Sequence, residues 1–331
     1  MKNQPPFDRR AIPATARLFH RPAPDGWPLR MFDWPPEGGS RGSLLFLGGR
    51  GDIIEKYLES FAHWRAAGWH IRAVDWRGQG GSGRLSSDPL CGHADDFAPW
   101  IADLADFGGD WMATTPGPHV VIGHSMGGHL LLRGLAEGAI APDAAVLVAP
   151  MLGLHSGPLG PRVGGAIAAL LARIGRPDRM AWKTNERPSL PGASRRRLLT
   201  HDAERYADEL WWKQANPDIA LGPPSWAWVA AAYRSIAGLD RPGVLERIAT
   251  PVLLLGAERD GLVKAAAIRR AARRLPAAEL LMFGPESAHE ILRESDAVRD
   301  RALARIDAFL AARAAGPAPA PVSAAGDAPA A

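Results

Sequence analysis

Ser125 lies between two glycines in the stretch Gly123-His124-Ser125-Met126-Gly127, which follows an apolar run and precedes a leucine-rich helical pattern. A serine in a G-x-S-x-G turn from a strand into a helix is held out where its hydroxyl can act as a nucleophile. Gly123 and Gly127 would leave room for that tight turn, and the Met126 amide at the helix N-terminus could face a developing oxyanion. The alternative is that Ser125 merely caps the helix.

A second match to the same pattern serves as a comparison within the chain. Residues 38–42, GGSRG, also fit, but they follow the segment PPE, with no strand before them and no helix after them. We expect Ser40 to lie in a surface turn, because the nucleophile elbow requires the strand and helix that flank Ser125.

A serine hydroxyl needs a base and an orienting carboxylate. Four histidines follow Ser125 in the sequence: His129, His155, His201 and His289. His129 lies one turn along the same helix, His155 and His201 fall in a helical insertion, and His289 follows a predicted strand at 280–283. Strand ends gather at one sheet edge, so His289 is the predicted base.

The predicted carboxylate is Asp260, which follows the apolar run 252–255 after a short loop. Glu258 and Asp52 are competitors; Glu258 could pair with Arg259, and Asp52 would break the chain order of serine, acid and histidine. The second oxyanion donor is expected in LFLGGRGD, where two glycines allow a tight turn and the Arg50 amide could point at the site. A glycine-rich turn without a catalytic role is the alternative.

These residues would be positioned by alternating strands and helices. Short apolar runs at 44–47, 70–74, 119–122, 144–148, 252–255 and 280–283 are separated by helical patterns at 52–67, near 97–104 and near 296–313. This alternation predicts an α/β fold with a mostly parallel central sheet and helices on both faces. We expect residues 1–152 and 241–313 to form the core, 153–240 a helical insertion, and the Ala/Pro-rich 314–331 a disordered tail.

Composition and charge bear on the binding partners and the compartment that we expect for this protein. The 331 residues carry 39 basic and 35 acidic side chains, a net charge of +4 without the basic stripe of a nucleic-acid-binding protein. The mild excess would favour weak contact with an anionic membrane surface. A single cysteine, Cys91, favours a reducing compartment, and the N-terminus lacks a signal-peptide core, so we expect a cytoplasmic protein, with peripheral contact to the inner membrane left open.

Taken together, the chain resembles the α/β-hydrolases, and among them the bacterial lysophospholipases and monoacylglycerol lipases, over about residues 15–313. The resemblance rests on the segments LGGRGDIIEKY, VDWRGQGGSGRL, CGHADDF, IGHSMGGH, APMLGL, LGPPSWAWVAAAYRS, GAERDGLV and SAHEI. It implies Ser125 as nucleophile, Asp260 as acid, His289 as base, and the amides of Arg50 and Met126 as the oxyanion hole. It also implies that the insertion caps an acyl-binding pocket.

The resulting hypothesis is a serine hydrolase that cleaves carboxylic esters of lipids through an acyl-enzyme, with no metal or cofactor. The small-molecule substrate would be a lysophospholipid or a monoacylglycerol. A short-chain carboxylesterase or an aminopeptidase of the same fold, and a non-catalytic hydrolase-like binding module, remain as alternatives. Tryptophans of the insertion could line a channel for one acyl chain or could pack inside the insertion itself.

Overall fold

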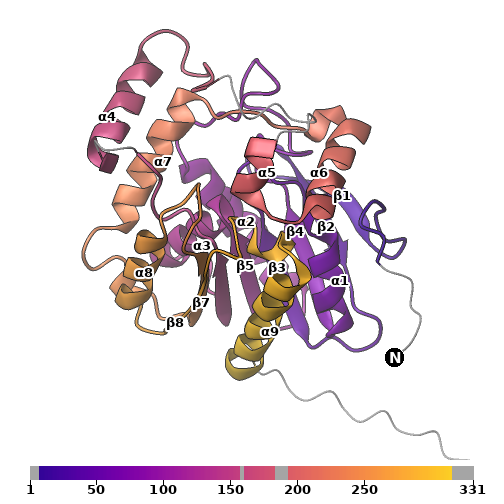
Figure 1. Ribbon diagram of the computed structural model, residues 1–331. Coiled ribbons are helices and arrows are strands. Elements are labelled where there is room, and N and C mark those ends of the chain that lie inside the picture. The colour runs from indigo at the N-terminus through magenta and orange to yellow at the C-terminus, as the bar shows by residue number, and fades with distance from the viewer. Residues whose placement is uncertain (1–6, 157–159, 183–192, 315–331) are drawn as a thin grey trace, which may run out of the picture.

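The computed structural model describes residues 7–156, 160–182 and 193–314. A single eight-stranded sheet forms its centre, with helices on both sides (Figure 1). The strands are β1 (Arg17–Pro22), β2 (Pro28–Trp34), β3 (Gly42–Leu47), β4 (Trp69–Val74), β5 (His119–His124), β6 (Ala144–Val148), β7 (Val252–Ala257) and β8 (Ala278–Phe283). Their spatial order is β1-β2-β4-β3-β5-β6-β7-β8. Every pair from β4 to β8 is parallel, which confirms the predicted α/β fold with a mostly parallel sheet.

Two antiparallel strands at the start of the sheet were not predicted from the sequence. β1 pairs with β2, and β2 pairs with β4, both antiparallel. Their signal is weak because β1 is largely exposed, prolines stand at Pro22 and Pro28, and no helix separates the two strands. The alternation of strand and helix that reveals the parallel strands is therefore absent here.

Nine α-helices and four short 3₁₀ turns make up the rest of the regular structure in the described residues. They are η1 (Ile54–Tyr57), α1 (Leu58–Ala66), α2 (Ala98–Thr114), α3 (Met126–Glu137), α4 (Gly160–Arg173), α5 (Ala193–Leu199), α6 (Ala203–Ala215), η2 (Pro217–Ile219), α7 (Trp226–Leu239), η3 (Leu245–Arg247), α8 (Ala265–Arg274), η4 (Ile291–Arg293) and α9 (Asp296–Arg313). The helix predicted over 52–67 starts two residues later, as a 3₁₀ turn, and Asp52 stays in the loop.

The sheet separates two hydrophobic cores. Leu45 and Leu47 of β3 pack with α2, α3 and α8, whereas Leu44 and Phe46 face the opposite core with α1 and α9. Because both faces are covered, β3 is buried along its whole length and appears in the sequence as a continuous apolar run. No described helix combines the length and apolar composition needed to cross a bilayer.

The segment between β6 and β7 supplies α4, α5, α6 and α7, which Figure 1 shows above the ends of the central strands. Its described part contains helices and adds no strand to the sheet. Its last helix, α7, packs on both α4 and α3 and so connects the segment to the core. The division of the chain at 153 and 240 stays a prediction. The predicted disordered tail, apart from the buried Ala314, lies outside the described residues.

Candidate active site

Ser125 occupies the turn between β5 and α3, with φ of 50° and ψ of −114°. This left-handed conformation is strained for a residue with a side chain, as expected of a nucleophile elbow. A Cβ on Gly127 would lie 2.2 Å from the Leu47 carbonyl oxygen, and a Cβ on Gly123 would lie 2.7 Å from Gly128 Cα. Both positions require glycine because α3 approaches the sheet so closely.

The alternative that Ser125 serves as a helix cap does not describe its side chain. Ser125 is the residue before α3, but its side chain makes no capping hydrogen bond. Its Oγ instead lies 2.9 Å from Nε2 of His289, a residue 164 positions further along the chain. The hydroxyl is therefore paired with an imidazole, the group that could accept its proton.

His289 bridges Ser125 and Asp260. Its Nδ1 lies 2.7 Å from Oδ2 of Asp260, while the other oxygen, Oδ1, accepts hydrogen bonds of 2.8 and 3.0 Å from the amides of Leu262 and Val263. The carboxylate is thus fixed by its own loop and holds the ring with Nδ1–H donated to Asp260. Nε2 is left with a lone pair facing the Ser125 hydroxyl.

Burial and charge have opposite effects on the pKa values of His289 and Asp260. Burial alone would lower the pKa of His289, but the charge of Asp260 and their hydrogen bond raise it above its ordinary value. Burial alone would raise the pKa of Asp260, yet His289 and the two backbone amides lower it. The arrangement favours an ionised carboxylate next to an imidazole able to take up a proton.

The competing residues are engaged by other partners. Glu258 was expected to pair with Arg259, but it pairs with Arg269. Asp52 contacts His124. Buried His129 bonds the hydroxyl of Ser235 at 2.7 Å.

Of the two histidines predicted in the insertion, His155 reaches the site and His201 does not. His201 pairs with Glu294. His155 lines the same pocket, and its Nε2 lies 3.0 Å from the backbone oxygen of Asp260. The loop after β6 brings it there, where Leu154 forms a β-bridge with Val263.

The expected oxyanion donors lie beside the serine. The Gly49 backbone is so close that a Cβ there would lie 3.0 Å from the Ser125 Cβ, and Arg50 follows directly and lines the pocket. Met126 is the first residue of α3, so its amide is among those without an acceptor inside the helix. The Arg50 side chain turns away and donates to the Gly222 carbonyl at 2.8 Å.

A buried charged network next to the site was missed by sequence reasoning. The Lys56 ammonium lies 2.5 Å from Asp52, 2.6 Å from Glu290 and 3.3 Å from Glu209 of α6. Arg293 contacts the same two glutamates. The pairs Asp52–Lys56 and Glu290–Arg293 are close in the sequence, but the fold brings these pairs together with each other and with Glu209.

Asp52 also connects this network to the nucleophile elbow. Its Oδ2 accepts from the Gly49 amide at 2.7 Å and contacts Tyr57 Oη and His124 Nδ1, both at 2.8 Å. His124 is buried, and its ring nitrogen takes part in these polar contacts.

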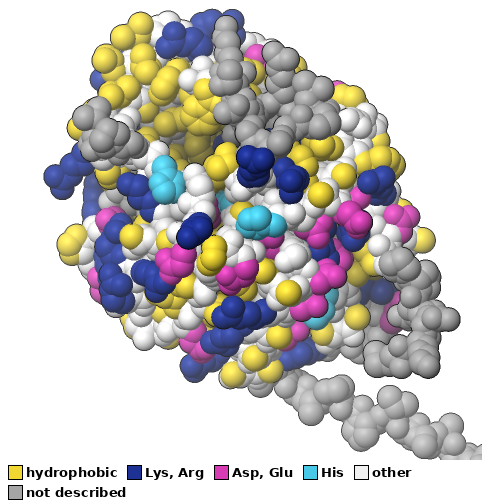
Figure 2. Space-filling view, in the orientation of Figure 1, with side chains coloured by type: hydrophobic (Ala, Val, Ile, Leu, Met, Phe, Trp, Pro, Cys, Tyr) yellow, Lys and Arg dark blue, Asp and Glu magenta, His cyan; other side chains and the backbone are white. Residues whose placement is uncertain are grey.

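A pocket of about 490 Å³ surrounds the Ser125 hydroxyl, a size typical of small-molecule sites. Its walls include Leu154, Trp182, Leu198, Trp228 and Val229, so the segment between β6 and β7 supplies much of its apolar surface. Figure 2 shows hydrophobic side chains around a hollow at the top of the molecule, over α4 and α7.

Two tryptophans of the segment, Trp182 and Trp228, line the pocket. Trp212 packs into the core shared by the sheet, α1 and α9, and not inside the segment itself. Within the described residues, no cluster of three or more His, Cys, Asp or Glu side chains is placed to hold a metal ion.

Comparisons with known proteins agree with this fold. Residues 38–296 match the model of the serine aminopeptidase S33 family. The chain is 32% identical to "Lysophospholipase L2" of Escherichia coli K12 over 243 residues, 69% of this chain and 68% of that protein. It is 27% identical to "Probable lysophospholipase L2" of Haemophilus influenzae over 284 residues, 83% of this chain and 85% of that protein.

Solved structures show the same fold at lower identity. A soluble variant of monoglyceride lipase from Saccharomyces cerevisiae, in complex with a substrate analog, aligns with a TM-score of 0.71 at 20% identity, covering 93% of this chain and 99% of that one. A monoacylglycerol lipase from Paleococcus ferrophilus gives 0.66 at 20% identity, covering 86% and 99%. Since the family model spans most of the sequence, this chain belongs to the serine aminopeptidase S33 family of α/β-hydrolases.

Proposed function

We propose that this protein hydrolyses carboxylic esters of lipids through a Ser125, His289 and Asp260 triad. The observation that carries the proposal is the pair of hydrogen bonds, 2.9 and 2.7 Å long, by which His289 connects the serine to the carboxylate. Similarity to lysophospholipase L2 supports a lipid ester as the substrate class. The apolar walls of the pocket are suited to an acyl chain.

The reaction would proceed in two halves. His289 takes the hydroxyl proton as Ser125 attacks the ester carbonyl, and the amides of Arg50 and Met126 stabilise the negative oxygen. His289 then gives the proton to the leaving alcohol, and the acyl group stays on Ser125. Water, deprotonated by the same imidazole, releases the fatty acid and restores the serine.

Two observations bear on the choice of substrate. An aminopeptidase needs a carboxylate to bind the free amine of its substrate, but Asp52 and Glu290, which line the pocket, are both engaged by Lys56. Arg195 also lines the pocket and adds positive charge that could attract a phosphate head group. We therefore place lysophospholipid first and monoacylglycerol second, ahead of an aminoacyl substrate or a short-chain ester.

Ser125→Ala tests the chemistry, and a substrate panel tests the class. The variant should lose all ester hydrolysis and all labelling by a fluorophosphonate, while keeping the circular dichroism spectrum of the wild type. Retained labelling would remove Ser125 from the mechanism. The wild type is assayed with lysophosphatidylcholine, monoacylglycerol, a short p-nitrophenyl ester and an aminoacyl p-nitroanilide; a preference for the anilide would contradict the lipid assignment, and no turnover of any would favour a binding module.

We further propose that α4 rests on an anionic membrane surface. Val163, Ile167 and Leu170 of α4, and Ile174 directly after it, are 42, 43, 57 and 55% exposed and recur at helical spacing, so they form one apolar stripe on the solvent side. An exposed stripe of this kind is typical of helices that lie at a membrane interface.

Vesicle sedimentation tests this contact. Leu170→Ser should weaken binding to vesicles that contain phosphatidylglycerol, but leave hydrolysis of a short soluble ester unchanged. Leu90→Ser, at a loop residue 40% exposed, is the matched control. Equal vesicle binding by both variants would count against α4 as the contact.

A further inference from the structure

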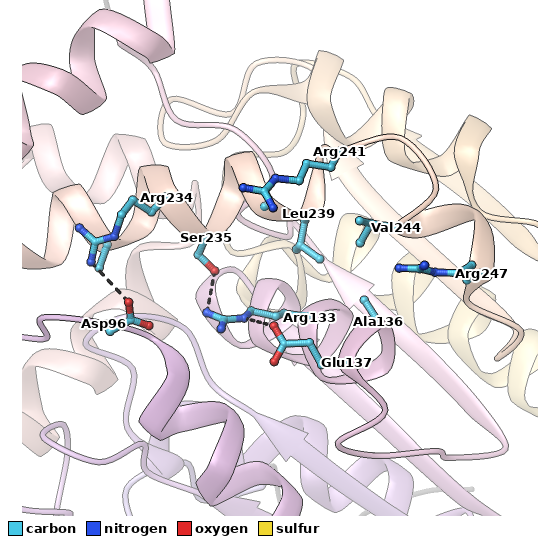
Figure 3. Close-up of a pocket in the computed structure, with 12 residues that line it drawn as sticks. Asp96, Arg133, Ala136, Glu137, Arg234, Ser235, Leu239, Arg241, Val244 and Arg247 are labelled. Carbon is cyan, nitrogen blue, oxygen red and sulfur yellow. Dashed lines mark hydrogen bonds and ion pairs between the residues drawn. The ribbon is translucent and has the colours of Figure 1, made fainter.

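A second pocket, of about 410 Å³, lies where α3, α7 and the connection to η3 meet (Figure 3). Among the described residues, none lines both this pocket and the one at Ser125. Helix α7 supplies residues to each: Trp228, Val229 and Tyr233 line the first, whereas Arg234 and Ser235 line the second. The second pocket is therefore a separate feature and is not used in the proposed hydrolysis.

Positive charge dominates this second pocket. Four arginines line it, against two carboxylates, a surplus of two charges: Arg133, Arg234, Arg241 and Arg247, with Asp96 and Glu137. The carboxylates are already engaged, because Glu137 accepts from Arg133 at 2.6 Å and Asp96 lies 3.5 Å from Arg234.

The other two arginines lack such partners. In the part of the chain that the structure describes, Arg241 and Arg247 form no ion pair within 4 Å. Their neighbours in sequence, Asp240 and Glu246, are instead bound by Arg274, at 3.1 and 2.8 Å. Figure 3 shows the Arg241 and Arg247 guanidinium groups both directed back over the pocket.

The floor of the pocket combines one hydroxyl with apolar side chains. Ser235 Oγ is buried and accepts a hydrogen bond of 3.2 Å from Arg133. Leu239 and Ala231 are buried beside it, and Val244 is half-buried. An anionic ligand in this pocket would therefore contact guanidinium groups with its charged end and apolar side chains with its other end.

We propose that this pocket binds the phosphate group of a phosphate monoester, held by Arg241 and Arg247. A monoester phosphate carries about 1.5 to 2 negative charges near neutral pH, which matches the surplus of two on the pocket, whereas a carboxylate supplies one. Arginine also binds phosphate oxygens in a bidentate manner. The volume of the pocket leaves room for a short organic group on that phosphate, and glycerol 3-phosphate serves as a small probe of this class.

Isothermal titration of the wild-type protein with glycerol 3-phosphate at low ionic strength tests the site. We expect saturable binding that weakens with added salt, and binding of glycerate, the carboxylate analogue, that is about tenfold weaker. Arg241→Gln and Arg247→Gln should each raise the dissociation constant about tenfold. Arg273→Gln, an exposed arginine on α8 outside the pocket, is the charge-matched control and should bind like the wild type.

A second arm of the experiment distinguishes a free phosphate monoester from the phosphate head group of a lipid. Vesicles of phosphatidylcholine with and without phosphatidic acid are sedimented with the same proteins. A loss confined to the Arg241 and Arg247 variants, in either arm, supports the site, and the arm in which it appears identifies the source of the phosphate. Absence of binding in both arms, equal losses in Arg273→Gln, or glycerate binding as tight as glycerol 3-phosphate would each overturn the proposal.

Discussion

Replacing Lys56 by methionine should test whether the buried charged network stabilises the fold. The Lys56 side chain is 2% exposed and its ammonium contacts Asp52, Glu209 and Glu290, each also nearly inaccessible to solvent. In the wild type, Arg293 and Lys213 also contact Glu209, and Arg293 contacts Glu290. Methionine has a similar length but removes the ammonium that all three carboxylates contact.

The expected cost follows from the loss of that ammonium. Removing one partner of a buried ion pair typically destabilises a protein by about 3–5 kcal/mol, because the remaining charge is left without compensation. Urea unfolding followed by tryptophan fluorescence gives the change in the free energy of unfolding from the midpoint and slope. Lys264→Met is the control, since half-exposed Lys264 has no ion pair among the described residues; we expect it to change the free energy by less than about 0.5 kcal/mol.

The pH dependence of the lost free energy of unfolding distinguishes an effect of charge from an effect of packing. Burial would raise the pKa values of Asp52, Glu209 and Glu290, but neighbouring cations hold them below ordinary values. In the wild type, this contributes stability that is full above the unfolded-state pKa and is lost as pH falls through the lower folded-state values. Without Lys56, one carboxylate should instead have a raised pKa in the folded state, so it destabilises the protein at neutral pH and is relieved by protonation.

The deficit of Lys56→Met relative to the wild type should therefore shrink as pH falls from about 7 to about 5. Adding Glu290→Gln to Lys56→Met should recover part of the lost free energy at pH 7, since it removes one unpaired charge. A deficit no larger than that of Lys264→Met, or one that grows at lower pH, would refute the reasoning.

Three further predictions test the site itself. Asp260→Asn should lower kcat/KM by about 10⁴-fold, because the amide no longer holds His289 in the required tautomer, and fluorophosphonate labelling rates should fall with it; near-normal turnover would contradict this role. In the wild type, kcat/KM should fall on the acid side with an apparent pKa above about 6.5, because the raised pKa of His289 means that the base is protonated earlier as pH falls; an acid limb below that value would oppose the assignment. Gly127→Ala should destabilise the protein by at least about 1–3 kcal/mol in thermal unfolding, because its Cβ would meet the Leu47 carbonyl oxygen at 2.2 Å. Gly109→Ala on α2, where a Cβ meets nothing within 4 Å, should be neutral or stabilising, and equal effects of the two would refute the steric argument.

Local spacing was enough to predict the parallel strands and the candidate site. Each of these strands is short, apolar and followed by a helix, so its carboxyl end could be located from the sequence, and with it the positions of Ser125, Asp260 and His289. The structure joins these three side chains by hydrogen bonds, and their catalytic roles stay a prediction. The N-terminal hairpin escaped prediction because it lacks the helix that marks the other strands.

Long-range pairing was decided only by the tertiary structure. Lys56 meets Glu290 across 234 positions, and His155 reaches the Asp260 backbone across 105. Nothing in the sequence near either residue specifies its partner, because a charged side chain on a loop or helix looks the same whether it is solvated or buried. Burial makes the difference: once packing of α6 against the core excludes water, each charge must be matched, and the matching residues come from wherever the fold brings the chain together.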